Sequence, residues 1–168
     1  MALIISERET QSHLYFLRGV FSNFQPCKII YQGLTFPTTE HAFMWAKAEF
    51  FGDQQAKLKI LQTDNPKEAQ NIGREVKNYD DTKWNAVRYQ IMYDINLIKY
   101  QQNPQLAKCL LSTGMKTLVE TNGKDKIWGI GLYASDDRVL DESKWKGENR
   151  LGKVLMRVRQ TLRENKNV

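Results

Sequence analysis

The stretch TTEHAFMWAK, residues 38–47, does the most to define this chain. Thr39 carries a hydroxyl suited to capping a helix N-terminus, so we expect a helix over residues 39–51. Glu40 would lie in the first turn, where a carboxylate suits the positive end of the helix dipole. Lys47 follows seven residues later, and because an α-helix has about 3.6 residues per turn, Glu40 and Lys47 share one helix face.

Spacing alone leaves two interpretations of Glu40 and Lys47 open. A Glu and a Lys on one helix face are commonly solvated surface charges that contribute little to stability. Phe43 and Met44, however, lie on adjoining parts of the same face and bring both charged groups close to apolar material. Charged groups in such surroundings are either costly or functional. We therefore take Glu40 and Lys47 as the candidate catalytic pair.

Composition predicts one globular domain over residues 1–168, with its core at about 13–165. The chain has 168 residues, of which 41% are hydrophobic and 26% charged, enough to bury a sizeable core. The apolar run at the N-terminus is short, and no window reaches the length of a signal peptide or membrane span. We expect an intracellular, cytoplasmic protein with no membrane partner.

Cysteine and histidine usage argues against a metal site. Cys27 and Cys109 are far apart in the sequence, and buried free thiols are the expected state for both. Only His13 and His41 could join them, and no pair has metal-ligand spacing. The sequence therefore predicts neither a bound metal nor a cofactor.

The charge balance favours anionic partners. The formal net charge is +6 and the isoelectric point is near 9.3, which suits nucleic acids, nucleotides and phosphorylated metabolites. Much of the excess lies in the last helix, whose Lys and Arg residues fall on several faces. A solvated surface accounts for that helix as well as a binding stripe does.

Hydrophobic periodicity predicts an α+β fold that is mostly α-helical, with a small antiparallel β-sheet. The expected strands are 14–17, 27–31 and 34–36, the last two joined by a tight hairpin, and 117–120 and 126–128, joined through an Asn122-Gly123 turn. The expected helices after residue 51 cover 56–61, 66–76, 81–98, 104–113 and 151–162.

A long loop is expected over residues 129–147. Loops longer than about 12 residues inside compact domains are usually functional. This one carries Asp136, Asp137, Asp141 and Trp145. The loop is therefore a candidate binding segment.

Short motifs that are weak singly occur in a specific order along nearly the whole chain, from about residue 17 to residue 163. They are Phe21-Ser22-Asn23-Phe24, Thr39-Glu40-His41 with Lys47, Gly73-Arg74, Trp84, Leu118-Val119-Glu120, Trp128-Gly129, and Gly147-Glu148-Asn149-Arg150-Leu151-Gly152 followed by Leu155-Met156. In this order and spacing the chain resembles the NADAR family. That family includes bacterial N-glycosidases of riboflavin-biosynthesis intermediates and hydrolases that remove ADP-ribose from guanine bases.

The resemblance implies a mainly helical fold with a small sheet and a pocket for ADP-ribose or a related phosphoribosyl compound. It implies hydrolysis of a C–N bond at the anomeric carbon, with Glu40 and Lys47 as catalytic residues. ADP-ribosylated DNA or RNA then joins the candidate partners. The ligand-binding residues expected on this basis, with one acid of the long loop added, are Asn23, Gly73, Arg74, Glu120, Trp128, Gly129, Asp141 and Asn149.

The chain also departs from part of the family. Some relatives, including the bacterial riboflavin-pathway type, carry an Asp two residues after the Trp of the Trp-Gly motif, where this chain has Ile130. A longer segment, Leu132 to Lys146, replaces the short Gly-rich link found there. Both differences weaken assignment to the riboflavin-intermediate activity.

The chemistry explains why an acid and an amine are needed. Cleavage of a glycosidic C–N bond builds positive charge on the ribose and negative charge on the departing base. Glu40 can stabilise the sugar cation or activate water. A neutral Lys47 amine can attack an opened ribose aldehyde and hold it as an imine, as the family is thought to do, or a charged Lys47 can simply contact a phosphate or hydroxyl.

The other motif residues have structural alternatives. Trp84 on an amphipathic helix is expected in the core, whereas Trp128, expected to end a strand, is expected to contact the ligand. Arg74 can clamp a pyrophosphate or lie on the surface at a helix end. Turn geometry is an alternative role for Asn23, and Asn149 can serve as the N-cap of the last helix.

Three functions compete at this point. The first is an N-glycosidase acting on an ADP-ribosylated or phosphoribosylated amine, with early riboflavin intermediates as the alternative substrate. The second is a module that binds ADP-ribose or NAD without hydrolysing it. The third is a basic nucleic-acid-binding domain, for which the sequence offers charge but no recognised motif. The presence of both Glu40 and Lys47 favours the enzyme.

Overall fold

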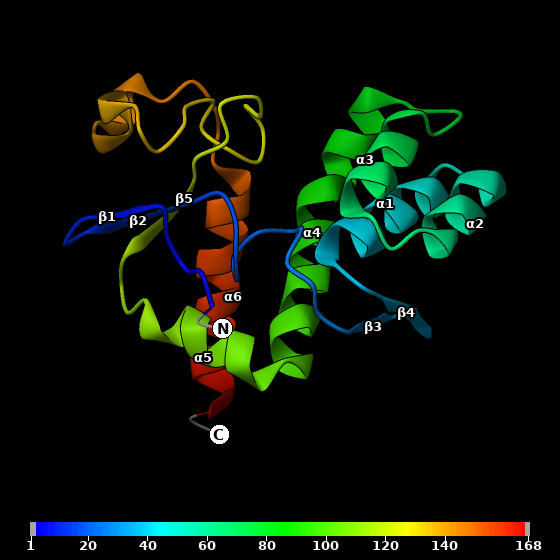
Figure 1. Cartoon of the computed structure of the whole chain (residues 1–168). Coiled ribbons are helices and arrows are strands. Elements are labelled where there is room, and N and C mark those ends of the chain that lie inside the picture. Colours follow the sequence, from blue (N-terminus) through cyan, green and yellow to red (C-terminus); the bar gives the residue numbers. More distant parts are fainter. Residues whose placement is uncertain (1–2, 167–168) are drawn as a thin grey trace. The chain divides into compact units, whose positions relative to one another are not determined.

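The computed structural model describes residues 3–166 (Figure 1). The chain divides into two compact units, Asn23–Asn103 and Met1–Ser22 with Pro104–Val168. We call the first the helical unit and the second the sheet unit. The helical unit is thus inserted, along the sequence, into the sheet unit.

Four helices and a hairpin make up the helical unit. Its elements are β3 (Ile29–Tyr31), β4 (Leu34–Phe36), α1 (Thr39–Phe50), α2 (Gln54–Gln62), α3 (Pro66–Arg74) and α4 (Asp81–Gln102). Helix α1 packs against α2, α3 and α4, which cover it on several sides (Figure 1). All six expected segments are present, and α4 runs four residues further than the apolar pattern indicated.

Side-chain caps set the starts of these helices. Thr38, Asp53, Asn65 and Asp80 each accept hydrogen bonds from backbone N–H groups of the first turn that follows. The cap of α1 is Thr38, so the expectation that Thr39 caps it is wrong by one residue. Thr38 takes the extended conformation of a cap, whereas Thr39 is already helical.

The expected hairpin at residues 29–36 is confirmed. Strands β3 and β4 pair antiparallel with Ile29 opposite Phe36, and the turn residues Gln32 and Gly33 have φ of 48° and 77°. Positive φ at both turn positions matches the twist of the flanking strands. The side-chain amide of Gln102 donates to the Ile30 carbonyl at 3.0 Å and accepts from the Ile30 N–H at 2.7 Å, so it occupies the edge of β3 as a further strand would.

The sheet unit is built from both ends of the chain. Its elements are β1 (Arg8–Glu9), β2 (His13–Phe16), α5 (Pro104–Ser112), β5 (Thr117–Glu120), the short 3₁₀ helices η1 (Asp137–Leu140) and η2 (Glu142–Lys144), and α6 (Arg150–Lys166). The strands lie in the order β1-β2-β5, and α6 packs on β5 (Figure 1). Strands β1 and β2 are antiparallel, but β2 and β5 are parallel, so this sheet is mixed rather than purely antiparallel.

The expected strand at 126–128 does not form, and residues 122–123 do not join a hairpin. The Asp125 carboxylate accepts hydrogen bonds from the N–H groups of Ile127 and Trp128, both at 2.8 Å. A side chain that binds its own following backbone holds a turn and removes those N–H groups from any ladder. Trp128 therefore lies in a turn rather than at a strand end.

The segment 129–147 is ordered around a small hydrophobic cluster. Ile130, Leu132 and Val139 are buried against Tyr15 and Val119 of the sheet. The indole N–H of Trp145 donates to the Val139 carbonyl at 2.8 Å, and Asp136 and Asp141 cap η1 and η2. The expected irregular loop is thus a packed segment with two 3₁₀ turns.

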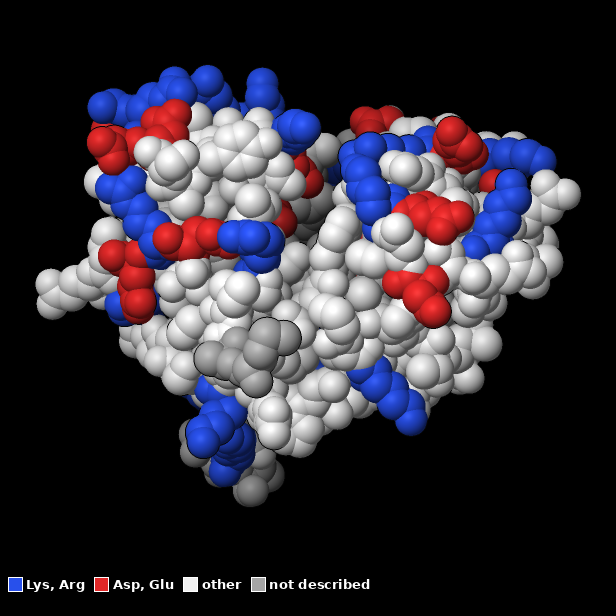
Figure 2. Space-filling model, in the orientation of Figure 1, with Lys and Arg blue, Asp and Glu red and all other residues white. Residues whose placement is uncertain are grey.

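The cysteines are free thiols, as expected, but each is only half-buried. Cys109 lies in α5, and Cys27 precedes β3. No helix within residues 3–166 is long and apolar enough to cross a membrane. On the face drawn in Figure 2, acidic groups lie among the basic ones, so no continuous basic stripe is seen there.

Candidate functional site

The first turn of α1 holds Glu40 in buried surroundings. The Glu40 backbone N–H donates to the Asn23 carbonyl at 2.9 Å, and Glu40 is only 6% exposed. His41, next in sequence, contacts the Thr38 hydroxyl through Nδ1 at 2.7 Å and the Thr63 carbonyl through Nε2 at 2.9 Å. Burial lowers the pKa of His41, so a neutral ring that braces the helix start is favoured. The backbone at Glu40 is therefore held in place.

Lys47 lies two turns further along α1 and is half-buried. Its Nζ donates to the Gly73 carbonyl at 2.8 Å and lies 4.6 Å from the centroid of the Tyr79 ring. Burial lowers the pKa of Lys47, the charge on Arg88 lowers it further, and Glu40 acts in the opposite direction. A lowered pKa raises the fraction of neutral amine, which is the nucleophilic form.

Gly73 allows α3 to approach α1 closely. A Cβ placed on Gly73 would lie 1.9 Å from the Met44 sulfur. Because that space is filled by Met44, only glycine fits without displacing it. The close approach brings the Gly73 carbonyl within hydrogen-bonding distance of Lys47, so Gly73 serves the site through its backbone.

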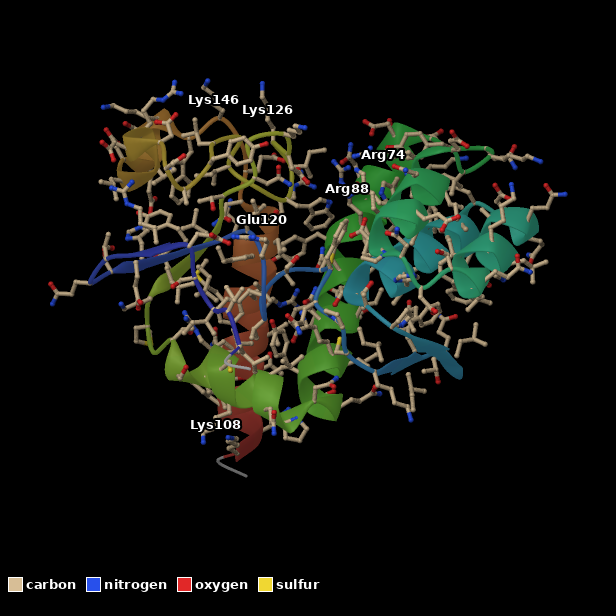
Figure 3. The ribbon with its side chains drawn as sticks, viewed as in Figure 1. Arg74, Arg88, Lys108, Glu120, Lys126 and Lys146 are labelled. Carbon is tan, nitrogen blue, oxygen red and sulfur yellow. The ribbon has the colours of Figure 1, made fainter. Side chains whose placement is uncertain are left out.

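Two arginines add positive charge to this region. Arg74 ends α3 and is exposed, whereas Arg88 lies on α4 and is 8% exposed (Figure 3). Both lie close enough to Lys47 to lower its pKa. The helical unit thus gathers three cationic side chains from α1, α3 and α4, and the Glu40 carboxylate acts electrostatically on Lys47.

Asn23 lies at the start of the helical unit and is 9% exposed. Its amide donates to the Met92 sulfur at 3.6 Å, and its Oδ1 has no hydrogen-bond partner within residues 3–166. A buried carbonyl oxygen without a partner is costly. Its position next to the Glu40 backbone keeps Asn23 a candidate for ligand contact.

In the sheet unit, Asn149 connects β5 to the start of α6. Its Oδ1 accepts from the Glu120 N–H at 3.0 Å, and its Nδ2 donates to the Leu118 carbonyl at 2.9 Å. It immediately precedes α6, at the N-cap position, but its side chain binds the strand instead of the helix. Asn149 therefore fixes the backbone of Glu120, which is itself 8% exposed.

Trp128 and Gly129 lie close to the same strand end. Trp128 is half-buried, and its carbonyl accepts from the Leu151 N–H at 3.1 Å. The Gly129 carbonyl accepts from the Asn149 N–H at 3.1 Å. A Cβ on Gly129 would lie 3.1 Å from the Glu120 carbonyl oxygen. Gly129 therefore permits a close approach between the turn and the end of β5.

Asp141 is exposed, and its carboxylate binds the backbone of its own segment. It accepts from the Ser143 N–H at 3.0 Å and the Ser143 hydroxyl at 2.6 Å. These hydrogen bonds lower the pKa of Asp141. The side chain is fully engaged in capping η2 and pairing with Lys144, and these contacts account for an Asp at this position without a ligand.

The expected site residues thus form two groups. Glu40, Lys47, Gly73, Arg74 and Asn23 gather in the helical unit. A second group in the sheet unit joins Glu120, Trp128, Gly129 and Asn149 around the end of β5, and Asp141 is not part of its contacts.

Sequence reasoning missed Arg88 and Tyr79. Arg88 follows Trp84 by one turn and precedes Met92 by one turn, and both of these residues are buried. An arginine on the apolar face of an amphipathic helix is unusual, and the sequence alone shows this position of Arg88. Trp84 itself is 3% exposed and packs against Phe43, as the core interpretation required.

The chain matches one family over almost its whole length. The sequence model of the NADAR domain matches residues 10–163. An N-glycosidase of Acanthamoeba polyphaga mimivirus is 42% identical over 123 residues, which are 73% of this chain and 72% of that protein. A riboflavin biosynthesis protein of Vibrio vulnificus is 33% identical over 88% of this chain, which spans 36% of that longer protein.

A solved structure is similar as well. The N-glycosidase YbiA of Escherichia coli is 33% identical over 86% of this chain and 81% of its own length. The NMR structure of the E. coli protein YbiA superposes with a TM-score of 0.76 at 30% identity, covering 96% of this chain and 91% of that one.

Proposed function

Because this chain belongs to the NADAR domain family, we propose that it is an N-glycosidase that hydrolyses the bond between ribose and a base or amine. The observation that carries the proposal is the pair on α1. A buried carboxylate, Glu40, acts electrostatically on Lys47, an amine whose pKa is lowered by burial. An exposed, solvated pair would show neither property.

Glu40 has the chemistry that the reaction needs at the sugar. As the C–N bond breaks, positive charge develops at the anomeric carbon, and a carboxylate held nearby in water-poor surroundings stabilises it. The same carboxylate can take a proton from the attacking water, while the departing base takes one up. The His41 ring and the Asn23 carbonyl hold the backbone from which Glu40 extends.

Lys47 supports a covalent variant of this route. Once the ribose ring of the N-glycoside opens to an iminium at C1, the neutral Lys47 amine adds to C1, a proton passes to the nitrogen of the base, and the base leaves, so that Lys47 holds C1 as an imine. The carbonyl of Gly73 and the ring of Tyr79 orient the amine. Hydrolysis of the imine then returns the lysine and releases the sugar.

For the substrate we propose ADP-ribose attached to a nucleobase, guanine in the first instance. The three cationic side chains Lys47, Arg74 and Arg88 suit a phosphorylated ribosyl compound. The alternative is an early riboflavin-biosynthesis intermediate, which the name of the Vibrio relative favours. Ile130, where some relatives have an Asp, is buried in a hydrophobic cluster and argues against that alternative.

The test is a direct comparison of substrates. The full chain is incubated separately with DNA carrying ADP-ribosyl-guanine and with early riboflavin intermediates, and released ADP-ribose, base or amine is identified by mass spectrometry. We expect release from the modified DNA, and preferential release from riboflavin intermediates would favour the alternative. Binding of ADP-ribose by calorimetry with no turnover of either substrate would identify a binding module instead of an enzyme.

A further inference from the structure

Arg88 is the most deeply buried cation near the candidate site, and the catalytic scheme does not use it. It lies on α4 and is 8% exposed. Its Nε is buried and has no hydrogen-bond partner within residues 3–166. A guanidinium stays protonated at any physiological pH, so its charge is carried into the protein whatever surrounds it.

No ion pair inside the helical unit neutralises Arg88. Arg88 acts electrostatically on Lys47, which is also cationic, and on Tyr79. Asp80 and Asp81 also act on Tyr79, but Asp80 accepts from the Lys83 N–H, and Asp81 accepts from Tyr79 and Asn85. Neither carboxylate forms a salt bridge with Arg88 in the part of the chain that the structure describes.

A buried guanidinium without a counter-charge is costly, and an anion that binds beside it recovers that cost. Resting on the function proposed above, we propose that Arg88 binds a phosphate group of the substrate beside Lys47. The planar guanidinium offers a fork of N–H donors that matches two phosphate oxygens. Arg74, at the end of α3, contributes a second positive charge near Lys47.

The phosphate has two chemical sources. It is the pyrophosphate of an ADP-ribosyl compound or the monoester of a phosphoribosyl amine. In both, the phosphate is attached to the 5′ carbon of the ribose whose anomeric carbon reacts. A phosphate held by Arg88 therefore positions the sugar relative to Lys47 and Glu40.

A pair of aldehydes tests the proposal without any glycosidase turnover. Pyridoxal 5′-phosphate and pyridoxal both condense with a neutral lysine amine to an imine that borohydride fixes, and they differ in the phosphate. The measured quantity is the ratio of their labelling rates at Lys47, followed by peptide mass spectrometry and divided by the same ratio for free Nα-acetyllysine, because pyridoxal closes to an internal hemiacetal and its phosphate ester does not. Replacing Arg88 also changes the pKa of Lys47, but that change affects both aldehydes alike and cancels in the ratio.

The variants are Arg88→Met, which removes the charge, and Arg88→Lys, which keeps it but loses the fork. Lys83→Met is the matched control, because Lys83 is an exposed cation on the same helix. We expect the parent chain to prefer pyridoxal 5′-phosphate by about tenfold to hundredfold, the range for charge-assisted hydrogen bonds. The preference should vanish in Arg88→Met, fall partly in Arg88→Lys and persist in Lys83→Met.

Two outcomes overturn the proposal: a parent ratio near one, or an unchanged ratio in Arg88→Met that retains the parent's circular dichroism. If Arg88→Met does not fold, Arg88→Lys decides, because an undiminished preference in it overturns the bidentate contact. If the parent hydrolyses no N-glycoside yet shows the Arg88-dependent preference, the phosphate site stands and the proposed activity fails.

A second arm identifies the source of the phosphate. ADP-ribose and ribose 5-phosphate are compared as protectors of Lys47 against pyridoxal 5′-phosphate in the parent and in Arg88→Met. If only ADP-ribose protects Lys47 in an Arg88-dependent way, the pyrophosphate is supported as the source. If only ribose 5-phosphate does so, the monoester is supported. Protection that does not depend on Arg88 in either case contradicts the proposal.

Discussion

The two units differ in how their charged side chains form ion pairs. Inside the sheet unit, most charged residues between 136 and 150 form ion pairs. Its ion pairs are Arg8–Asp137, His13–Glu142, Arg18–Glu7, Lys116–Glu9, Arg138–Asp136, Lys144–Asp141 and Arg150–Glu148. Inside the helical unit, Lys57 and Glu49 form an ion pair at the surface. Lys47, Arg74 and Arg88 form none of these pairs.

Several buried polar atoms in the helical unit also lack a hydrogen-bond partner within the described residues. Side-chain atoms that are buried without a hydrogen-bond partner within residues 3–166 include Asn23 Oδ1, Thr39 Oγ1, Trp45 Nε1, Arg88 Nε and Asn96 Oδ1. Each such atom lowers stability unless something compensates. Groups that the fold itself satisfies hold the backbone in place, whereas groups that it leaves unsatisfied are candidates for binding and chemistry.

The largest effect is expected at Lys47. Lys47→Arg keeps the positive charge but not the nucleophile, since guanidinium stays protonated. If the covalent route operates, turnover should fall by a factor on the order of a thousand or more. Cyanoborohydride present during turnover should leave a mass increment on the peptide containing Lys47 in the parent and none in the variant.

Lys59→Arg is the control, because Lys59 is exposed on α2. Trapping should also increase with pH through the lowered pKa of Lys47, since the neutral amine reacts. Full activity in Lys47→Arg would rule out the imine and leave Glu40 and water as the mechanism.

The next largest effect is expected at Glu40. Glu40→Gln keeps the shape of the side chain and removes its charge, so turnover should fall by about a hundredfold or more while ADP-ribose affinity stays close to that of the parent. Steady-state kinetics and calorimetry give the two quantities. Glu49→Gln, on the exposed end of the same helix, should leave turnover intact. Unchanged turnover in a folded Glu40→Gln would reduce Glu40 to a helix-stabilising residue.

A smaller effect is expected at Lys99, which is buried in the helical unit and is not part of the candidate site. It is fully buried, and burial lowers its pKa to about 8. Lys99→Met should therefore increase the free energy of unfolding at pH 7 by about 1–3 kcal/mol, as measured by urea denaturation. Lys83→Met should leave it nearly unchanged.

The difference in unfolding free energy between Lys99→Met and the parent should depend on pH in a definite direction. Between about pH 8 and the usual lysine pKa, Lys99 is neutral in the folded chain and protonated in the unfolded chain. The unfolded chain then binds more protons, so the parent gains stability from this group as pH rises. The advantage of Lys99→Met should shrink over that range, and an advantage that is constant with pH would mean that packing and not charge is responsible.

The smallest effect is expected at Asp141 in the sheet unit. Its carboxylate is engaged by Ser143 and Lys144, so Asp141→Ala should lower the melting temperature slightly. KM for the active substrate should stay within roughly twofold of the parent value. A tenfold rise in KM in a variant with normal melting behaviour would return Asp141 to the ligand-binding residues.

Local patterns predicted local structure well. The hairpin at residues 29–36 follows from Gln32-Gly33, and Asn65-Pro66 marks the start of α3. The core position of Trp84 follows from its place on an amphipathic helix. In each case the residues that determine the structure lie within a few positions of it, so the sequence carries the information directly.

The wrong structural predictions have two causes. A side chain competed for the backbone N–H groups of an expected strand, and two strands paired that are far apart in the sequence. Residues 126–128 have strand character, but the Asp125 carboxylate captures their N–H groups. The parallel pairing of β2 with β5 joins segments about a hundred residues apart and leaves no local signal. The candidate pair on α1 followed from its spacing together with its apolar neighbours, whereas Arg88 was not singled out, although it lies between Trp84 and Met92 on the apolar face of α4.

The insertion of one unit within the other also bears on synthesis at the ribosome. Every element of the helical unit has been translated by Asn103, including Gln102, which closes the edge of β3. Strand β2 is translated early, but its partner β5 emerges only after α5. The nascent chain can therefore complete its middle first, while its N-terminal strands wait for the C-terminal third, and the residues proposed for catalysis are in place before the sheet closes.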